Sequence, residues 1–125
     1  MPLSKMTAGI FGAVYALVGL VGFAVTGFAG TGTLIVFNLS VLHNVVHVVI
    51  GVAGLGAFAA GAAASRTFCQ VAGAVLGLLA ILGVIIANPF GILPLGGADV
   101  GLHLVSALVL LYVGFAGSPR EGAIP

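Results

Sequence analysis

Charged side chains are almost absent from this 125-residue chain, in which Asp, Glu, Lys and Arg together make up 4% of the residues. A water-soluble domain carries roughly a quarter charged residues, most of them on its surface. With 62% hydrophobic residues and a mean hydropathy of +1.40, the composition excludes a soluble fold and indicates a protein of the lipid bilayer. Three basic residues cannot neutralise a row of phosphates, so nucleic-acid binding is excluded too.

Cysteine occurs once, at Cys69. A single cysteine excludes an internal disulfide, a CxxC redox pair and a cysteine-cluster metal site, and we interpret Cys69 as a small buried hydrophobic residue. No nucleophile has a base at a recognisable spacing, and Asp99 is the one carboxylate expected within the membrane. Tyr15 and Tyr112 are interpreted as packing or interfacial residues. We therefore expect no catalytic residues and a protein that is not an enzyme.

Apolar runs account for most of the chain. A helix needs about 20 apolar residues to cross the hydrocarbon core of a bilayer. Four runs meet this length, at about 7–27, 40–63, 68–87 and 98–116. Since backbone polar groups must be paired within a lipid-crossing segment, the prediction is all-α, an integral membrane four-helix bundle forming one transmembrane domain over 1–125. A signal peptide is the weaker interpretation of the first run, which exceeds the core length of about 7 to 15 residues.

The few basic residues predict the orientation of the bundle. With four spans, Lys5, Arg66 and Arg120 all fall on one side of the membrane, with Arg66 in a tight turn expected at Ser65–Arg66. The opposite connections, an apolar loop around residues 30–33 and a Pro-rich loop over 88–97, contain no Lys or Arg. Because basic residues concentrate in cytoplasmic loops, both termini are predicted to be cytoplasmic.

The two halves of the chain resemble each other. The first and third spans share glycines at an offset of 61 residues, and the second and fourth spans match at an offset of 56. The second offset aligns His43 with Asp99 and His47 with His103. Units of about 7–63 and 68–116 are therefore predicted as two tandem parallel helical-hairpin repeats. Close helix contacts are expected at the small residues Gly12, Ala16, Gly19, Ala57, Gly61, Gly73 and Gly77.

All three histidines and the acid outside the tail fall at equivalent places in this repeat. His43 and His47 are four residues apart, as are Asp99 and His103, so each pair is predicted to share one helix face. Both pairs lie in the first turns of their spans, at the extracytoplasmic end. Ionisable groups at membrane depth usually face a bundle interior, so their convergence is the clearest indication of a site.

The first interpretation of this cluster is structural. Asp99 would cap the fourth helix, while Asn38 or Ser40 would cap the second, because side-chain oxygens accept the free N–H groups of a helix start. The histidines would then bond to the backbone or to Asn44 and hold the two repeats together. In this case Asn38, Ser40 and Asn44 form a structural polar cluster.

The second interpretation is a binding site for a cofactor. A divalent metal such as zinc, copper or iron could be held by His43, His47, Asp99 and His103, because pairs spaced by four residues on adjacent helices build metal sites in bundles. A haem could instead be held by His47 and His103, one from each of two helices. The choice among a divalent metal, a haem and no cofactor stays open at this point.

The segment Asn38 to His47, followed by Gly51 and Gly54-Leu55, resembles the signature of the bacterial membrane family called domain of unknown function 4383. The stretch from Gly91 to Asp99, continuing through His103, resembles the second motif of that family. Gly97 and Val100 stand where the family pattern usually has Asn, which leaves the second half of a polar site less well satisfied. The resemblance implies a small four-helix protein of the bacterial cytoplasmic membrane and implies no activity.

Two functions are compatible with these sequence features. The favoured one is a structural or accessory subunit, whose partners are the lipid bilayer and either other membrane proteins or further copies of the chain. The alternative is a metal- or haem-binding membrane protein with its His/Asp site at the extracytoplasmic end. A channel or transporter is disfavoured because the middles of all four spans are almost purely apolar.

Overall fold

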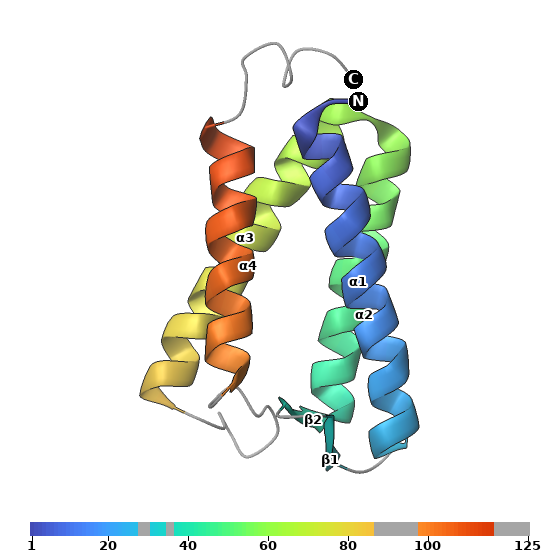
Figure 1. Cartoon of the computed structure of the whole chain (residues 1–125), viewed down its shortest axis with the longest axis vertical. Coiled ribbons are helices and arrows are strands. Elements are labelled where there is room, and N and C mark those ends of the chain that lie inside the picture. Colours follow the sequence, from blue (N-terminus) through green and yellow to red (C-terminus); the bar gives the residue numbers. More distant parts are fainter. Residues whose placement is uncertain (28–30, 35–36, 87–97, 117–125) are drawn as a thin grey trace.

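The structure, a computed structural model, describes residues 1–27, 31–34, 37–86 and 98–116, with side chains for 1–27, 31, 41–86 and 100–116. Four helices carry the fold, as predicted: α1 (Leu3–Thr26), α2 (Val41–Ala60), α3 (Ala62–Ile85) and α4 (Ala98–Ala116). The most extensive packing joins α1 to α2 and α3 to α4, so the molecule consists of two helical hairpins side by side (Figure 1). The predicted Pro-rich loop over 88–97 and the tail from 117 lie outside the described residues.

Three of the helices, α1, α2 and α3, are long and apolar enough to cross a membrane. The apolar part of α4, Val100–Ala116, is shorter. Large aliphatic side chains such as Leu17, Leu78 and Val105 are more than 60% exposed along the outer faces of the helices. Such surfaces are stable in contact with acyl chains and not with water, so the helices fit a membrane protein.

A two-stranded antiparallel ribbon connects α1 to α2, formed by β1 (Thr31–Leu34) and β2 (Phe37–Ser40). Thr31 pairs with Ser40, and Leu34 pairs with Phe37. Residues 31–33 of the predicted apolar loop belong to β1, and strand pairing satisfies their backbone polar groups. The ribbon lies at the end of the molecule where α2 and α4 begin, called the ribbon end below (Figure 1).

The turn between α2 and α3 lies at Gly61, at the opposite end of the molecule, called the turn end below. The predicted turn at Ser65–Arg66 was wrong, because α3 already begins at Ala62. Gly61 has φ of +123°, a conformation that residues with a Cβ rarely adopt. Ser65 instead lies within α3, where its Oγ donates a hydrogen bond of 3.0 Å to the carbonyl of Ala57 in the last turn of α2.

Basic and polar side chains satisfy helix ends at the turn end. Arg66 Nε and Gln70 Nε2 each donate to the carbonyl oxygen of Gly114 at 2.8 Å. The last carbonyls of a helix have no partner within the helix and carry partial negative charge, so a guanidinium group stabilises the end of α4. Lys5 lies at the same end, with its Nζ 5.2 Å from the centre of the Phe58 ring. Arg120 lies outside the described residues.

Glycines bring the backbones of α1 and α2 into contact. A Cβ placed on Gly12 would lie 2.6 Å from the backbone nitrogen of Leu55, and one on Gly54 would lie 2.8 Å from the carbonyl oxygen of Ala8. Gly73 of α3 similarly faces Leu111 of α4. The predicted role of Gly12 and Gly73 in helix contacts is confirmed, because these positions are too close to a neighbouring helix for a side chain.

Candidate metal centre

Two of the histidines come from the first two turns of α2. His43 and His47 are 1% and 3% exposed, and their ring centres are 4.5 Å apart. Their Nε2 atoms lie 3.0 Å apart, so one imidazole donates its Nε2–H and the other accepts on its Nε2 lone pair. The predicted sharing of one helix face is confirmed, because a spacing of four residues returns a side chain to the same side of an α-helix.

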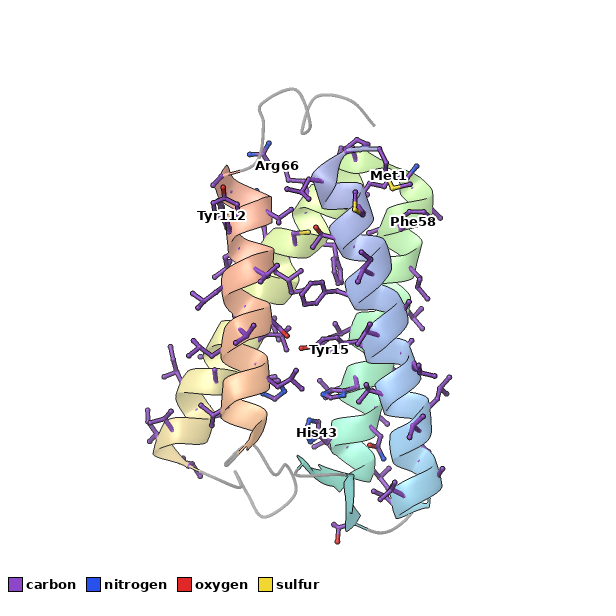
Figure 2. The ribbon with its side chains drawn as sticks, viewed as in Figure 1. Met1, Tyr15, His43, Phe58, Arg66 and Tyr112 are labelled. Carbon is purple, nitrogen blue, oxygen red and sulfur yellow. The ribbon has the colours of Figure 1, made fainter. Side chains whose placement is uncertain are left out.

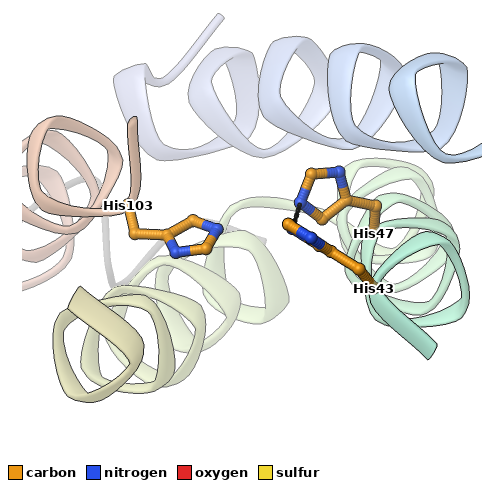
Figure 3. A group of neighbouring side chains, drawn as sticks. All are labelled: His43, His47 and His103. Atoms are coloured by element: carbon orange, nitrogen blue, oxygen red, sulfur yellow. Dashed lines mark hydrogen bonds between the residues drawn. The ribbon is translucent and has the colours of Figure 1, made fainter. Parts of the chain in front are cut away.

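The third histidine, His103, reaches the pair from α4. Its ring is 1% exposed, and its centre lies 5.8 Å from that of His43 and 6.2 Å from that of His47. Figure 3 shows its ring directed from α4 toward the two rings on α2. Among the residues that the structure describes, neither ring nitrogen of His103 has a hydrogen-bond partner. Two helical hairpins thus place three imidazoles around one buried point, which we call the histidine cluster.

The other predicted site residues are only partly covered by the structure. Asp99 lies in the first turn of α4, one turn before His103, and its side chain lies outside the described residues. The backbones of Asn38 and Ser40 belong to β2, and their side chains are likewise outside the described part. Asn44 is buried, and its Nδ2 donates to Thr26 Oγ1 of α1 at 2.8 Å, so this amide joins α1 to α2.

A tyrosine and a serine border the cluster and were missed as site residues. Tyr15 of α1 is buried, and its ring centre lies 5.1 Å from that of His47. Its hydroxyl donates to the Oγ of Ser106 on α4 at 2.8 Å, and Figure 2 shows the side chain pointing from α1 across the bundle. Ser106 follows His103 by three residues in α4, and that spacing was the signal that sequence reasoning could have used.

The three imidazoles bring three candidate metal ligands close together. One ligand nitrogen from each histidine can be chosen so that all three lie within 4.8 Å of one another. Nitrogens bound to one tetrahedral zinc ion lie about 3.3 Å apart, because each Zn–N bond is about 2.0–2.1 Å long. The Nε2 atoms of His43 and His47 have nearly this separation already, and the ligand nitrogen of His103 would have to come closer to them. Imidazole nitrogen is a preferred ligand of zinc, copper, iron and nickel.

The same geometry disfavours a haem held by His47 and His103. In a bis-histidine haem the flat macrocycle extends outward from the iron, midway between the two imidazoles. The ring of His43 lies only 4.5 Å from that of His47 and 5.8 Å from that of His103, so it occupies the space that the macrocycle would need. The site therefore fits a single ion better than a tetrapyrrole.

Comparisons with known proteins point to one family. A search among curated proteins and a search among solved structures gave no match. A family model described as Domain of unknown function (DUF4383) matches residues 5–116, a region that contains α1 from Lys5 onward, the other three helices and the histidine cluster. The chain therefore belongs to the DUF4383 family.

Proposed function

We propose that this protein is a multi-pass membrane protein that binds a transition metal ion at the histidine cluster. One observation carries the proposal: the imidazole of His103 is buried, faces two further imidazoles, and has no hydrogen-bond partner for either nitrogen among the described residues. Buried polar atoms are nearly always paired, so such a group calls for an explanation. An ion bound among the three rings would pair with one nitrogen of each histidine, including one of the two unpartnered nitrogens of His103.

The composition of the cluster supports this proposal. Three neutral imidazoles on facing helices leave one coordination position of a tetrahedral ion for a fourth ligand. In this proposal Asp99 is that ligand, because it precedes His103 by one turn in α4 and its carboxylate would offset the charge of the ion. The proposed role is binding of the ion rather than catalysis.

The proposal also assigns the setting of the site. Lys5 and Arg66 lie at the turn end, and the histidine cluster lies toward the ribbon end (Figure 2). Because basic residues mark the cytoplasmic side, the protein would sit in a bacterial cytoplasmic membrane with its cluster near the extracytoplasmic face. The α1–α2 and α3–α4 hairpins would be two parallel repeats, both entering from the cytoplasm.

Metal analysis of the purified protein tests the proposal. The full chain, purified in detergent without chelator, is expected to retain close to one equivalent of zinc or copper after dialysis. His103→Ala should lose the ion, because it removes the ligand contributed by α4. Gln70→Ala is the matched control, since it removes a polar side chain of similar size that bonds to Gly114 far from the cluster. No metal above background in the wild-type protein, even after incubation with zinc or copper, contradicts the proposal.

A second candidate function is that of an accessory subunit in a larger membrane complex. The supporting observation is an apolar groove of about 370 Å³ between α2 and α3, whose lining includes Val49, Ala53, Phe68 and Val71. Its exposed rim and small residues would accept side chains from a transmembrane helix of a partner, because membrane helices associate by close packing. Metal binding and this role can coexist.

Filling the groove tests the second candidate. Ala53→Leu would place a larger side chain in the groove and is expected to release a partner that co-purifies with the wild-type protein in mild detergent. Ala24→Leu, on the exposed face of α1, is the matched control and should retain the partner. Wild-type protein that elutes without a stoichiometric partner argues against the accessory role.

A further inference from the structure

A buried hydrogen bond connects the two helical hairpins beside the histidine cluster. Tyr15 of α1 and Ser106 of α4 are 3% and 4% exposed, and the tyrosine hydroxyl donates to the serine Oγ at 2.8 Å. The partners are 91 residues apart in the chain, so this bond forms only when the hairpins are docked. A hydroxyl pair in an apolar bundle is costly unless both members are bonded, so each holds the other in place.

The same two residues adjoin the histidines of opposite hairpins. The ring of Tyr15 lies against the ring of His47, with centres 5.1 Å apart and planes tilted by 51°. Ser106 lies one turn after His103 on α4, so the position of its Oγ and that of the His103 ring are coupled through one rigid helix. Tyr15 therefore contacts His47 of its own hairpin. It also donates a hydrogen bond to Ser106, which lies one turn from His103 of the other hairpin.

We propose that Tyr15 and Ser106 form a positioning latch that sets the gap between His103 and the His43–His47 pair. This inference rests on the proposed metal-binding function. Tyr15, which the sequence pattern assigned to packing, then determines whether three histidines or only two can bind one ion.

The geometry explains why such a latch is needed. The hairpins are joined covalently through Gly61 at the turn end, where the Ser4 Oγ of α1 also donates to the carbonyl of Ala62 on α3 at 3.3 Å. The cluster lies toward the other end, and its ligand atoms spread over 4.8 Å, more than the spacing of nitrogens on one ion. A small hinge movement at the turn end becomes a larger displacement at the cluster. The latch limits that displacement, because it ties α1 to α4 between the hinge and the histidines.

Cobalt(II) binding tests the effect on the site, since its visible absorption reports the number of ligands. Tyr15→Phe keeps the ring against His47 and removes the hydroxyl, and Ser106→Ala removes the acceptor. Each change is expected to lower the Co(II) affinity of the full chain by about ten- to a hundredfold, the usual effect of losing a residue that orients a metal ligand. The double variant should lose no more than either single variant, because both changes break one bond. The exposed Tyr112 provides the control variant, Tyr112→Phe, which should bind as wild type does.

A distance measurement tests the latch without metal. Spin labels on cysteines introduced at the exposed positions Leu20 of α1 and Leu108 of α4 report the separation of the hairpins, while the buried Cys69 stays unlabelled. Tyr15→Phe is expected to broaden the distance distribution in the metal-free protein, and Tyr112→Phe is expected to leave it unchanged.

The outcomes separate the latch from the proposed function. If Tyr15→Phe and Ser106→Ala leave Co(II) binding unaltered while His103→Ala abolishes it, the latch is overturned. The metal site is then retained. A wild-type protein that binds no Co(II) overturns the metal site itself. An unaltered distance distribution in Tyr15→Phe overturns the latch in either case.

Discussion

Polar residues inside the bundle fall into two groups at the scale of single residues. Those at the turn end, such as Ser65, Arg66 and Gln70, donate to carbonyl oxygens at the ends of neighbouring helices. They serve the fold, because these carbonyls would otherwise be unpaired in an apolar environment. His103 belongs to the other group, since its nitrogens have no hydrogen-bond partner among the described residues. This contrast separates structural polar residues from a candidate ligand.

The first prediction concerns pH. An imidazole binds a metal through a neutral nitrogen, so protons compete with the ion. Metal affinity is therefore expected to fall in acid, at the pH where the imidazoles of the cluster take up protons. Equilibrium dialysis with zinc at several pH values measures this dependence. Retention that does not fall at any acid pH at which the protein stays folded, or that survives His47→Ala, would rule out the histidine cluster as the site.

Close backbone contact is the decisive feature at the scale of the helices. The α1–α2 hairpin is built where Gly12 meets Leu55 and Gly54 meets Ala8, with no room for a Cβ between them. Helices in a bilayer gain little from hydrophobic burial, so their association depends on this close fit. The hairpin holds His47 at a fixed distance from Tyr15 of α1, and the site therefore depends on these glycines.

The second prediction follows from this contact. Gly12→Ala places a methyl group 2.6 Å from a backbone nitrogen of α2, so the helices must separate, at an expected cost of about 1–3 kcal/mol in the free energy of unfolding. Gly56→Ala is the matched control, because a Cβ there meets no described atom within 4 Å. That variant should be as stable as wild type or more stable by up to about 1 kcal/mol, since alanine favours helix. Denaturant titration in detergent compares the two, and equal losses would contradict this account of the interface.

The whole molecule is polarised along its long axis. The N-terminus, the Gly61 turn and the described cationic side chains of Lys5 and Arg66 lie at the turn end, and the histidine cluster lies toward the ribbon end (Figures 1 and 2). In a membrane this arrangement directs the basic residues to one face and the cluster toward the other. The side of the membrane from which an ion would reach the cluster therefore depends on how the protein is oriented in the bilayer.

The third prediction is that the turn end is cytoplasmic. A cysteine introduced at the exposed Thr31 in the ribbon should react with a membrane-impermeant maleimide on intact spheroplasts. A cysteine at the exposed Leu3 should react only after the membrane is permeabilised. The native Cys69 is buried and provides an internal baseline. The reverse labelling pattern would invert the orientation and place the cluster on the cytoplasmic side.

Sequence patterns anticipated much of the fold and part of the site. Four helices and the shared face of His43 and His47 were predictable, because apolar length and helical periodicity are local properties. The turn lies at Gly61 and not at the predicted Ser65–Arg66, because these polar side chains donate to carbonyl oxygens of neighbouring helices instead of marking a turn. The ribbon of β1 and β2 was missed, because two strands of four residues, one of them containing Gly32, carry a weak pattern.

The sequence by itself determined the solvent of this protein, because too few charges and too many apolar residues leave the bilayer as its medium. It also determined that the chain forms helices and that His43 and His47 share a face. Only the tertiary structure decided that His103 meets them and that Tyr15 bonds to Ser106 beside them. Helical periodicity specifies which side chains share a face, but the packing of two hairpins decides which faces meet, and that depends on contacts between residues far apart in the chain.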